Sequence, residues 1–518
     1  MRPLSACVAC RDRRKKCDRA PEATSCNLCI KRGLECSFER DPATVDKPLD
    51  QASVIFQDAE LIEELLDLYF RHVHIALPSL FHRPSFTAAV KDGTAPRIVL
   101  LGIASLSARF SSHLTFSGID PWERGRPYAK EAENLLDLHD TSLTTIQACI
   151  LLASHCVADG EPVTESVYYA IACRMAMLLD LPNTPVKTSI ERELNNRVWW
   201  SLVTSDTWLS AAFCLPRAIR PRQEVSLPIG EWTFAQLGAN DPVHDNLSRP
   251  ETSLESAESS FPVLPHMIKL NQILSEINSF CATVVAEEIH GGSLDVSIQH
   301  LSSILDSWYS DLPVRMQYSE ENLQHWINQG LGPKFVCLHI NYYNAGQRLF
   351  YQFLQHSQVS NECDSPAIAT YHQYAERCKS HARDLCDLIS HAKSRPEINI
   401  YYALAGHMLV IASTVQLHTL LFSMDEDEIQ GAKRRLERNF EMLIDIYTYW
   451  PVVYTSFSRL KAFHNACLKS KESSFRLDRW MLQFILEFSK PVDERKVGVR
   501  DREKDLWPLD QLRHLFEP

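Results

Sequence analysis

The amino-acid sequence predicts an all-α protein in which a small cysteine-rich module precedes a large helical body. Two observations favour helices. Glycine accounts for only 16 of 518 residues, below the roughly 7% of average usage, which argues against turn-rich β folds and Gly-rich nucleotide loops. From residue 58 onward, apolar residues recur at the i, i+3 and i+4 spacing of amphipathic helices. A chain of this length is too long for one small core, so we expect more than one domain.

Charge is unevenly distributed along the chain. The first forty residues hold ten Lys and Arg against five Asp and Glu, whereas the whole chain carries a net charge of −12. A basic module on an acidic body suggests that the module binds a polyanion and the body does not. The N-terminus carries no secretory signal, so we expect an intracellular protein with reduced thiols. The sixteen cysteines therefore need an explanation other than disulfides.

Six cysteines within the first forty residues form a repeat with the spacing C-x2-C-x6-C-x8-C-x2-C-x6-C. They are Cys7, Cys10, Cys17, Cys26, Cys29 and Cys36. Each C-x2-C pair can place two thiolates on one metal ion. Two separate tetrahedral zinc sites would need eight ligands, so six thiolates can serve two zinc ions only if two of them bridge. The segment is too short for a useful core, so metal binding must supply most of its folding free energy, about 10–16 kcal/mol per structural zinc site.

This segment resembles the zinc binuclear cluster of fungal transcription regulators, a DNA-binding module in which six cysteines hold two zinc ions. The doubled spacing, the basic run after the second cysteine and Pro21 in the x8 loop carry the resemblance. It implies that Cys7 and Cys26 bridge the ions. The other ligands would then be Cys10 and Cys17 on one ion, and Cys29 and Cys36 on the other. A redox dithiol set is the alternative interpretation.

A basic run, Arg11-Asp12-Arg13-Arg14-Lys15-Lys16, lies between the second and third cysteines. A short helix here would be held to the metal at both ends, with its cations directed at phosphates and guanine edges. In the family this helix enters the major groove and reads CGG triplets. The resemblance implies base contacts for Arg13, Arg14 and Lys16, and phosphate contacts for Arg11, Lys15, Arg19, Lys31 and Arg32. The alternative is a solvated face or a nuclear-import signal.

Residues 41–57 predict a linker. Many family members place a dimerising coiled coil after the cluster, but this stretch contains Pro42 and Pro48 and no sustained heptad. The protein either binds DNA as a monomer or forms a homodimer through its helical body, and the sequence does not choose between these.

The body resembles the fungal-specific transcription factor domain, also called the middle homology region. Residues 69–86 and 191–216 carry the resemblance, the second with the Trp199-Trp200 pair. Asn195-Asn196 and Cys214-Leu215 depart from the family pattern, which has basic residues at the first place and Gly-Arg at the second.

From both resemblances we expect the zinc cluster over 1–40, the linker over 41–57, the fungal-specific transcription factor domain over 58–270 and a helical continuation over 271–518.

Several polar residues of the body predict local structure rather than chemistry. The spacing of His72 and His74 does not place them on one helix face, so we expect packing or capping roles for them and for His82. Thr188 and Glu191 have the spacing of a capping box that begins a long helix. The Trp199-Trp200 pair is most simply a core feature, with a ligand-lining role as the alternative.

Residues 398–424 contain no Asp, Glu, Lys or Arg and could span a bilayer. Their histidines, glutamine and hydroxyls favour instead a central helix of the body, so we expect no membrane contact. The acidic run Asp425-Glu426-Asp427-Glu428 predicts the first turn of the next helix rather than an activation segment.

The sequence carries no G-x-S-x-G, H-E-x-x-H, Walker or G-x-G-x-x-G signature, so we expect no enzyme. Together with the resemblance, this implies a nuclear, sequence-specific transcription factor of RNA polymerase II genes that reads CGG-type half-sites in double-stranded DNA. Further partners would be the transcription machinery and a small-molecule effector that no residue identifies. Analogy suggests regulation of a secondary-metabolite gene cluster. The alternatives are regulation of a catabolic pathway and an interaction platform with weak direct DNA specificity.

Overall fold

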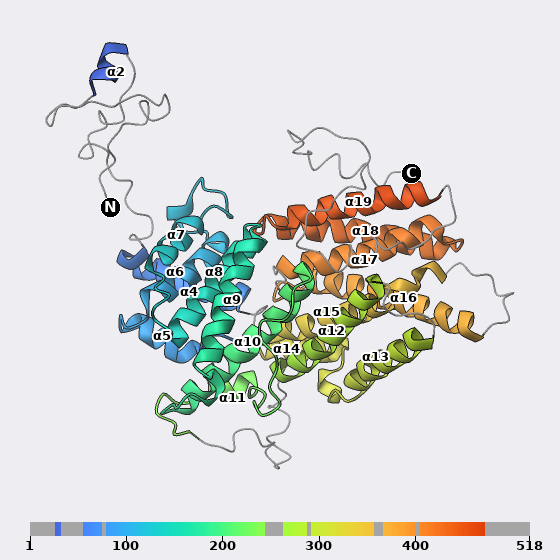
Figure 1. Cartoon of the computed structure of the whole chain (residues 1–518), viewed down its shortest axis with the longest axis horizontal. Coiled ribbons are helices and arrows are strands. Elements are labelled where there is room, and N and C mark those ends of the chain that lie inside the picture. Colours follow the sequence, from blue (N-terminus) through green and yellow to red (C-terminus); the bar gives the residue numbers. More distant parts are fainter. Residues whose placement is uncertain are drawn as a thin grey trace.

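The computed structural model describes residues 26–32, 55–74, 79–243, 263–286, 292–356, 366–398 and 403–471. Within these ranges the regular structure is helical, apart from one isolated β-bridge between Thr188 and Pro242. The prediction of an all-α protein is therefore confirmed. Figure 1 shows a small N-terminal helix and a large helical body.

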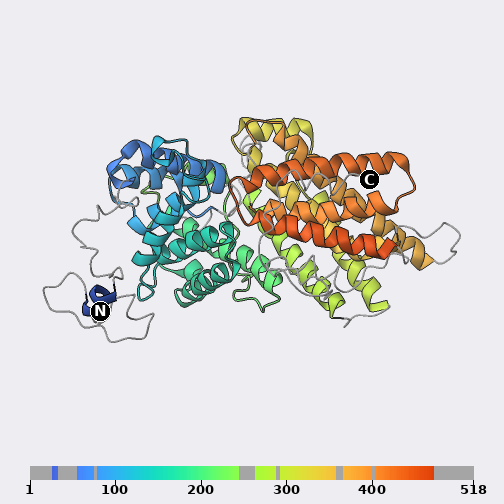
Figure 2. The ribbon, with the colours of Figure 1, turned by 90° about the horizontal axis from the view of Figure 1, so that it is seen from above.

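The body has an N-terminal half and a C-terminal half, which lie side by side in both ribbon views (Figures 1 and 2). The helices of the N-terminal half are α4 (Ala59–Leu68), the π-helical η2 (Tyr69–Val73), α5 (Arg83–Lys91), α6 (Arg97–Ser107), α7 (Arg126–Leu135), α8 (Leu143–Ala158), α9 (Pro162–Leu178), α10 (Ser189–Phe213) and α11 (Glu231–Ala235). The helices of the C-terminal half are α12 (Val263–Val285), α13 (Gly292–Ser310), α14 (Glu320–Asn328), α15 (Gly332–Phe350), α16 (Pro366–Lys393), α17 (Ala403–Phe422), α18 (Glu426–Tyr447) and α19 (Val453–Lys471). Short 3-10 turns are η1 (Ile55–Gln57), η3 (Ala108–Phe110), η4 (Leu114–Phe116), η5 (Leu181–Asn183), η7 (Val314–Met316) and η8 (Tyr351–His356).

One hydrophobic core runs through both halves, from Leu66 on α4 to Phe463 on α19. A smaller core joins α4, α6 and α7 around Tyr128. Residue 270, where the sequence suggested a boundary, lies inside α12. The division of the body at that position stays a prediction.

Arginine 109 joins the two halves through a buried guanidinium. Its side chain is 1% exposed, its Nη1 donates to the Tyr449 carbonyl at 2.8 Å, and its guanidinium lies 4.3 Å from the centre of the Trp450 ring. Burial lowers its pKa to about 10, which leaves it charged at neutral pH. A backbone bond from Val452 to Ala158 reinforces the same junction. The halves are therefore held in one arrangement by specific bonds as well as by apolar packing.

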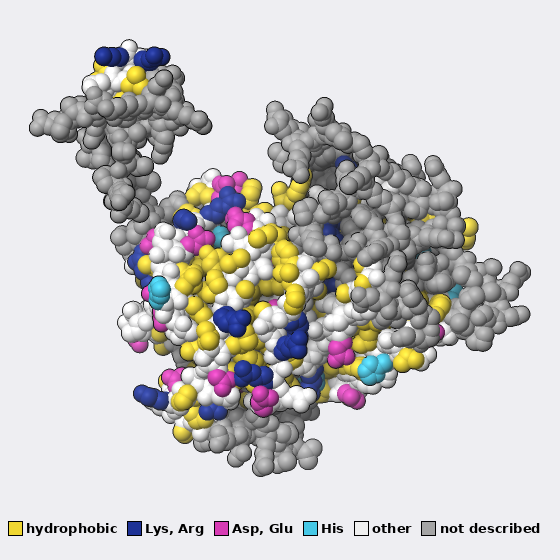
Figure 3. Space-filling view, viewed as in Figure 1, with side chains coloured by type: hydrophobic (Ala, Val, Ile, Leu, Met, Phe, Trp, Pro, Cys, Tyr) yellow, Lys and Arg dark blue, Asp and Glu magenta, His cyan; other side chains and the backbone are white. Residues whose placement is uncertain are grey.

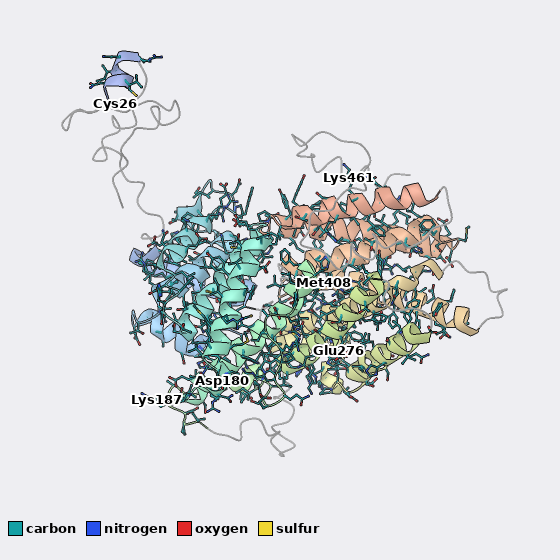
Figure 4. All side chains as sticks on the ribbon, in the orientation of Figure 1. Cys26, Asp180, Lys187, Glu276, Met408 and Lys461 are labelled. Atoms are coloured by element: carbon teal, nitrogen blue, oxygen red, sulfur yellow. The ribbon has the colours of Figure 1, made fainter. Side chains whose placement is uncertain are left out.

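Helix α10 begins with the predicted capping box. The Thr188 hydroxyl accepts from the Glu191 N–H at 3.2 Å, and the Glu191 carboxylate accepts from the backbone N–H groups of Thr188 and Lys187. Figure 4 labels Lys187 at this end of the body. The Trp199-Trp200 pair of α10 is buried, at 1% and 3% exposure, which confirms its core role.

The end of α10 explains one departure from the family pattern. Cys214 caps the helix in the left-handed conformation, with φ of 53°, a conformation that glycine adopts most readily. The family commonly has glycine at this position, two residues before Pro216. The chain therefore keeps the helix end while a cysteine takes the strained position.

The three histidines have the packing and capping roles expected of them. The His74 ring accepts from the Leu80 N–H at 3.0 Å, and His82 caps α5 by accepting from the Ser85 N–H. The His72 ring stacks on Phe110 with centroids 4.6 Å apart. None of the three therefore belongs to a metal-binding group in the described part of the chain.

Helix α17 lies in the apolar segment 398–424, for which the sequence predicts a central helix of the body. Its stretch Leu404–Phe422 is long and apolar enough to cross a bilayer, yet 83% of its most apolar window is buried inside the body. It packs against α15, α16, α18 and α19. The next helix begins as predicted, because the Asp425 carboxylate accepts from the N–H groups of Asp427 and Glu428.

We predict that Thr188→Ala lowers the free energy of unfolding by about 0.5–2 kcal/mol, because the N–H of Glu191 loses its acceptor. Urea unfolding followed by circular dichroism measures the loss. Ser112→Ala, which removes an exposed hydroxyl between helices, serves as the control and should change stability by less than about 0.5 kcal/mol. Equal losses in the two variants would contradict the role of the capping box.

Candidate metal centre and nucleic-acid interface

The described part of the N-terminal module is the helix α2 (Asn27–Arg32), which follows Cys26. The Ile30 N–H bonds the Cys26 carbonyl at 3.1 Å, so the C-x2-C pair forms one helical turn. Cys26 and Cys29 are 0% and 1% exposed, whereas Ile30 is 62% exposed. A module folded by a hydrophobic core would bury the isoleucine first. The opposite arrangement fits a module whose interior is formed by metal-binding thiolates.

The cationic residues of α2 lie at its C-terminal end. Lys31 and Arg32 occupy the last turn and are exposed, where the helix dipole favours positive charge. Figure 3 shows these Lys and Arg side chains on the outer surface of the module, and Figure 4 labels Cys26 at the start of the helix. The helix and the residue before it thus combine two buried thiols with two exposed cations.

Most of the residues predicted for this site lie outside the described ranges. These are the cysteines Cys7, Cys10, Cys17 and Cys36, and the basic residues Arg11, Arg13, Arg14, Lys15, Lys16 and Arg19. Their assignment as zinc ligands and DNA contacts stays a prediction.

The described cysteines of the body differ from those of the module. Burial raises the pKa of Cys149 and of Cys337 to about 12, so both remain protonated at neutral pH. A protonated thiol packs as a small hydrophobe and is a poor metal ligand. In the described ranges, no three His, Cys, Asp or Glu side chains are grouped to hold a metal ion.

The structure also contains a cavity that the sequence did not reveal. It has a volume of about 550 Å³ and lies between the two halves, lined by Phe81, Arg197 and Phe234 of one half and Ile327 and Lys334 of the other. We call it the junction cavity. The one hint in the sequence was the i, i+4 spacing of Glu193 and Arg197 in the first half of α10.

The polar wall of the junction cavity is an ion pair inside the protein. Arg197, which is 0% exposed, donates from Nε to Glu193 at 2.7 Å and from Nη2 to the Ile229 carbonyl at 2.6 Å. Glu193 also accepts from the Ile229 N–H at 3.0 Å. Burial raises the pKa of Glu193, whereas the charge and hydrogen bond of Arg197 oppose that shift.

Comparison with known proteins identifies both parts of the chain. Residues 5–44 match the fungal Zn(2)-Cys(6) binuclear cluster domain, and residues 66–329 match the fungal specific transcription factor domain. The second match alone covers just over half of the chain. The chain belongs to the fungal Zn(2)-Cys(6) transcription factors.

The relatives of this transcription factor are distant. It is 25% identical to the uncharacterized transcriptional regulatory protein C1327.01c of Schizosaccharomyces pombe, over 60% of this chain and 34% of the relative. A second protein of that yeast, PB1A11.04c, is 21% identical over 89% of this chain and 78% of its own length. The Zn(2)-C6 fungal-type transcription factor FTF1c of Fusarium oxysporum f. sp. lycopersici is 22% identical over 54% of this chain and 33% of its own length. The chain thus spans about a third of two of these relatives.

Membership of this family establishes the general role of the two parts of the chain. The N-terminal module binds two zinc ions and contacts DNA, and the protein is a transcription factor that acts in the nucleus rather than an enzyme. Zinc in such a module is structural, because it holds thiolates together in a segment that has no core of its own. The burial of Cys26 and Cys29 fits that role.

We predict that Cys29→Ala removes zinc from the module and abolishes its binding to DNA, because one ion loses a thiolate and the segment loses its folding free energy. A colorimetric zinc assay on the purified protein should give two zinc ions per wild-type chain and fewer in the variant.

Ile30→Ala is the matched control, since Ile30 is the neighbouring residue on α2 but is 62% exposed. This variant should keep both ions. If Cys29→Ala retained two zinc ions, the assignment of Cys29 as a ligand would be wrong.

Proposed function

We propose that this transcription factor regulates RNA polymerase II genes by reading CGG-type half-sites directly through its zinc cluster. The observation that carries the proposal is the doubled cysteine repeat, whose described pair is buried beside the exposed cations of α2. A metal-held frame keeps short basic helices rigid, so their cations can be aimed at a groove with little loss of conformational entropy.

The proposed contacts divide between bases and phosphates. Arg13, Arg14 and Lys16 would contact base edges, because Arg and Lys pair with the O6 and N7 acceptors of guanine in the major groove. The phosphate contacts would come from Arg11, Lys15, Arg19, Lys31 and Arg32, which would set the position of the module on the duplex. The proposed ligand sets are those implied by the family, with Cys7 and Cys26 as the bridging thiolates.

The charge of the module bears on how tightly it binds. Six thiolates carry more negative charge than two zinc ions neutralise, so the folded module is only modestly cationic. Strong binding would then need a second half-site or a further DNA contact. A homodimer formed through the helical body would supply the second half-site, and the choice between monomer and homodimer stays a prediction.

For the target genes we propose a secondary-metabolite biosynthetic gene cluster, by analogy with filamentous-fungal regulators of this organisation. A catabolic pathway is the second candidate. The third is an interaction platform for the transcription machinery with weak DNA specificity, which the acidic charge of the body favours. The proposed domain limits, 1–40, 41–57, 58–270 and 271–518, assign DNA reading to the first and regulation to the last two.

We predict that Arg14→Ala weakens binding to a CGG duplex by about 5- to 150-fold, because a bidentate contact with guanine is worth about 1–3 kcal/mol. Fluorescence anisotropy with the full chain measures the affinity. Wild-type affinity should also fall with salt by about 0.9 log unit per log unit of salt for each phosphate neutralised.

Arg438→Ala, which removes an exposed arginine of α18 in the body, is the matched control and should bind like the wild type. Equal affinity for CGG and scrambled duplexes would overturn direct reading and favour the platform.

A further inference from the structure

Arg197, which lines the junction cavity, has a side-chain nitrogen without a hydrogen-bond partner among the described residues. Two of the three nitrogens of Arg197 are bonded, to Glu193 and to the Ile229 carbonyl, and its guanidinium lies 4.1 Å from the centre of the Phe234 ring. Its Nη1 is buried and has no hydrogen-bond partner among the described residues. A buried charged donor that is left unpaired is unfavourable, so its presence in a cavity points to an acceptor that arrives from outside the chain.

A second cation lines the same cavity from the other half. Lys334, near the start of α15, lies 3.8 Å from Glu231, and its side chain is 17% exposed. The Glu231 carboxylate also accepts from the N–H groups of Val263 and Leu264 at the start of α12. Its negative charge is thus shared between a helix end and the lysine. An ammonium has three N–H donors, so Lys334 retains donors for a further acceptor.

His74 also lines the cavity, close to several cations. His74 is buried, and its pKa lies well below the usual value because of burial and because Lys334, Arg197 and Arg83 repel its charged form. The ring is therefore neutral at physiological pH. Because Nε2 accepts from the Leu80 N–H, its proton lies on Nδ1. His74 therefore adds no positive charge to this part of the wall.

The remaining lining limits the kind of anion that fits. Phe70, Phe81, Phe234, Ile327 and Leu331 give the cavity apolar walls, and 550 Å³ is in the size range of small-molecule pockets. Besides Arg197 and Lys334, the lining includes Arg71 and Arg83 and the carboxylates Asp67, Glu231 and Glu397. These carboxylates, with Glu193 paired to Arg197, would repel an anion of high charge such as a phosphate. A single carboxylate attached to an apolar body satisfies both conditions.

We propose that the junction cavity is a binding site for a small organic monocarboxylate, with its carboxylate at Arg197 and Lys334 and its apolar part against the phenylalanines. Arg197 belongs to α10 of the N-terminal half and Lys334 to α15 of the C-terminal half. A ligand that contacts both would stabilise the folded body, because it binds the folded but not the unfolded chain. In a transcription factor such a cavity is an effector site. That role rests on the proposed function, whereas the binding of a carboxylate does not.

Thermal unfolding of the full-length, zinc-loaded protein tests the proposal. The probes are octanoate, 4-phenylbutyrate, cinnamate and indole-3-acetate, each measured beside its primary amide. At least one carboxylate should raise the midpoint of unfolding by several degrees at millimolar concentration, while its amide has no effect, because the amide lacks the charge that Arg197 and Lys334 recognise. The proposal is wrong if no carboxylate raises the midpoint of unfolding more than its amide does. It is also wrong if inorganic phosphate raises the midpoint more than all four carboxylates do.

Two variants locate the binding. Lys334→Met should weaken binding of the best carboxylate by tenfold or more in isothermal titration calorimetry. Lys379→Met is the matched control, because Lys379 has a similar exposure of 16% and an acidic partner, Glu376, but lies outside the cavity. It should bind like the wild type. Equal affinity in the two variants would place the ligand elsewhere and overturn the proposal.

The conservative variant Arg197→Lys covers the case in which Lys334→Met unfolds the body. It keeps the charge but removes the second donor branch, so the carboxylate should bind more weakly while the midpoint without ligand shows whether the fold survives. A protein that binds the carboxylate but does not recognise CGG duplexes would refute the proposed function and leave this inference intact.

Discussion

The body of this protein depends on how it accommodates arginines that it has buried. A guanidinium keeps its charge at neutral pH, so a core that contains one must supply acceptors or aromatic faces around it. Arg109, Arg197 and Arg348 are among its largest fully buried side chains. Arg109 bonds the Tyr449 carbonyl across the junction, Arg348 of the C-terminal half lies 5.9 Å from the centre of the Trp208 ring of α10, and Arg197 lines the junction cavity. Arg109 therefore has a fixed acceptor across the junction, whereas the side-chain nitrogens of Arg348 and the Nη1 of Arg197 have no hydrogen-bond partner among the described residues.

The N-terminal module follows a different principle. In its described part Cys26 and Cys29 are buried and Ile30 is exposed, which fits a module stabilised by metal–thiolate bonds. The module should therefore respond to zinc supply, whereas the body should respond to whatever occupies its cavity. A regulator built in this way can respond to two signals, because zinc stabilises the module and a ligand in the cavity stabilises the body.

Sequence reasoning succeeded where the physical cause is local. The capping box of Thr188 and Glu191 and the cap by Asp425 both involve residues a few positions apart. It failed where distant segments meet. Arg197 and Lys334 lie on different helices, and no periodicity shows that they share a cavity. The sequence shows Cys214 only as a departure from the family pattern. Its left-handed conformation could not be predicted, because cysteine rarely has a positive φ. A boundary at 270 was equally hard to judge, because one core passes through α12 without a break in its apolar pattern.

The central claim is that this transcription factor finds its genes by reading DNA itself. Genome-wide chromatin occupancy of the tagged protein, with Arg14→Ala beside it, tests that claim most directly. The account predicts peaks that are enriched in CGG, concentrated at neighbouring biosynthetic promoters and lost in the variant. Peaks without CGG enrichment, or peaks that persist when Arg14 is replaced, would contradict it and would mean that partner proteins recruit the factor to its promoters.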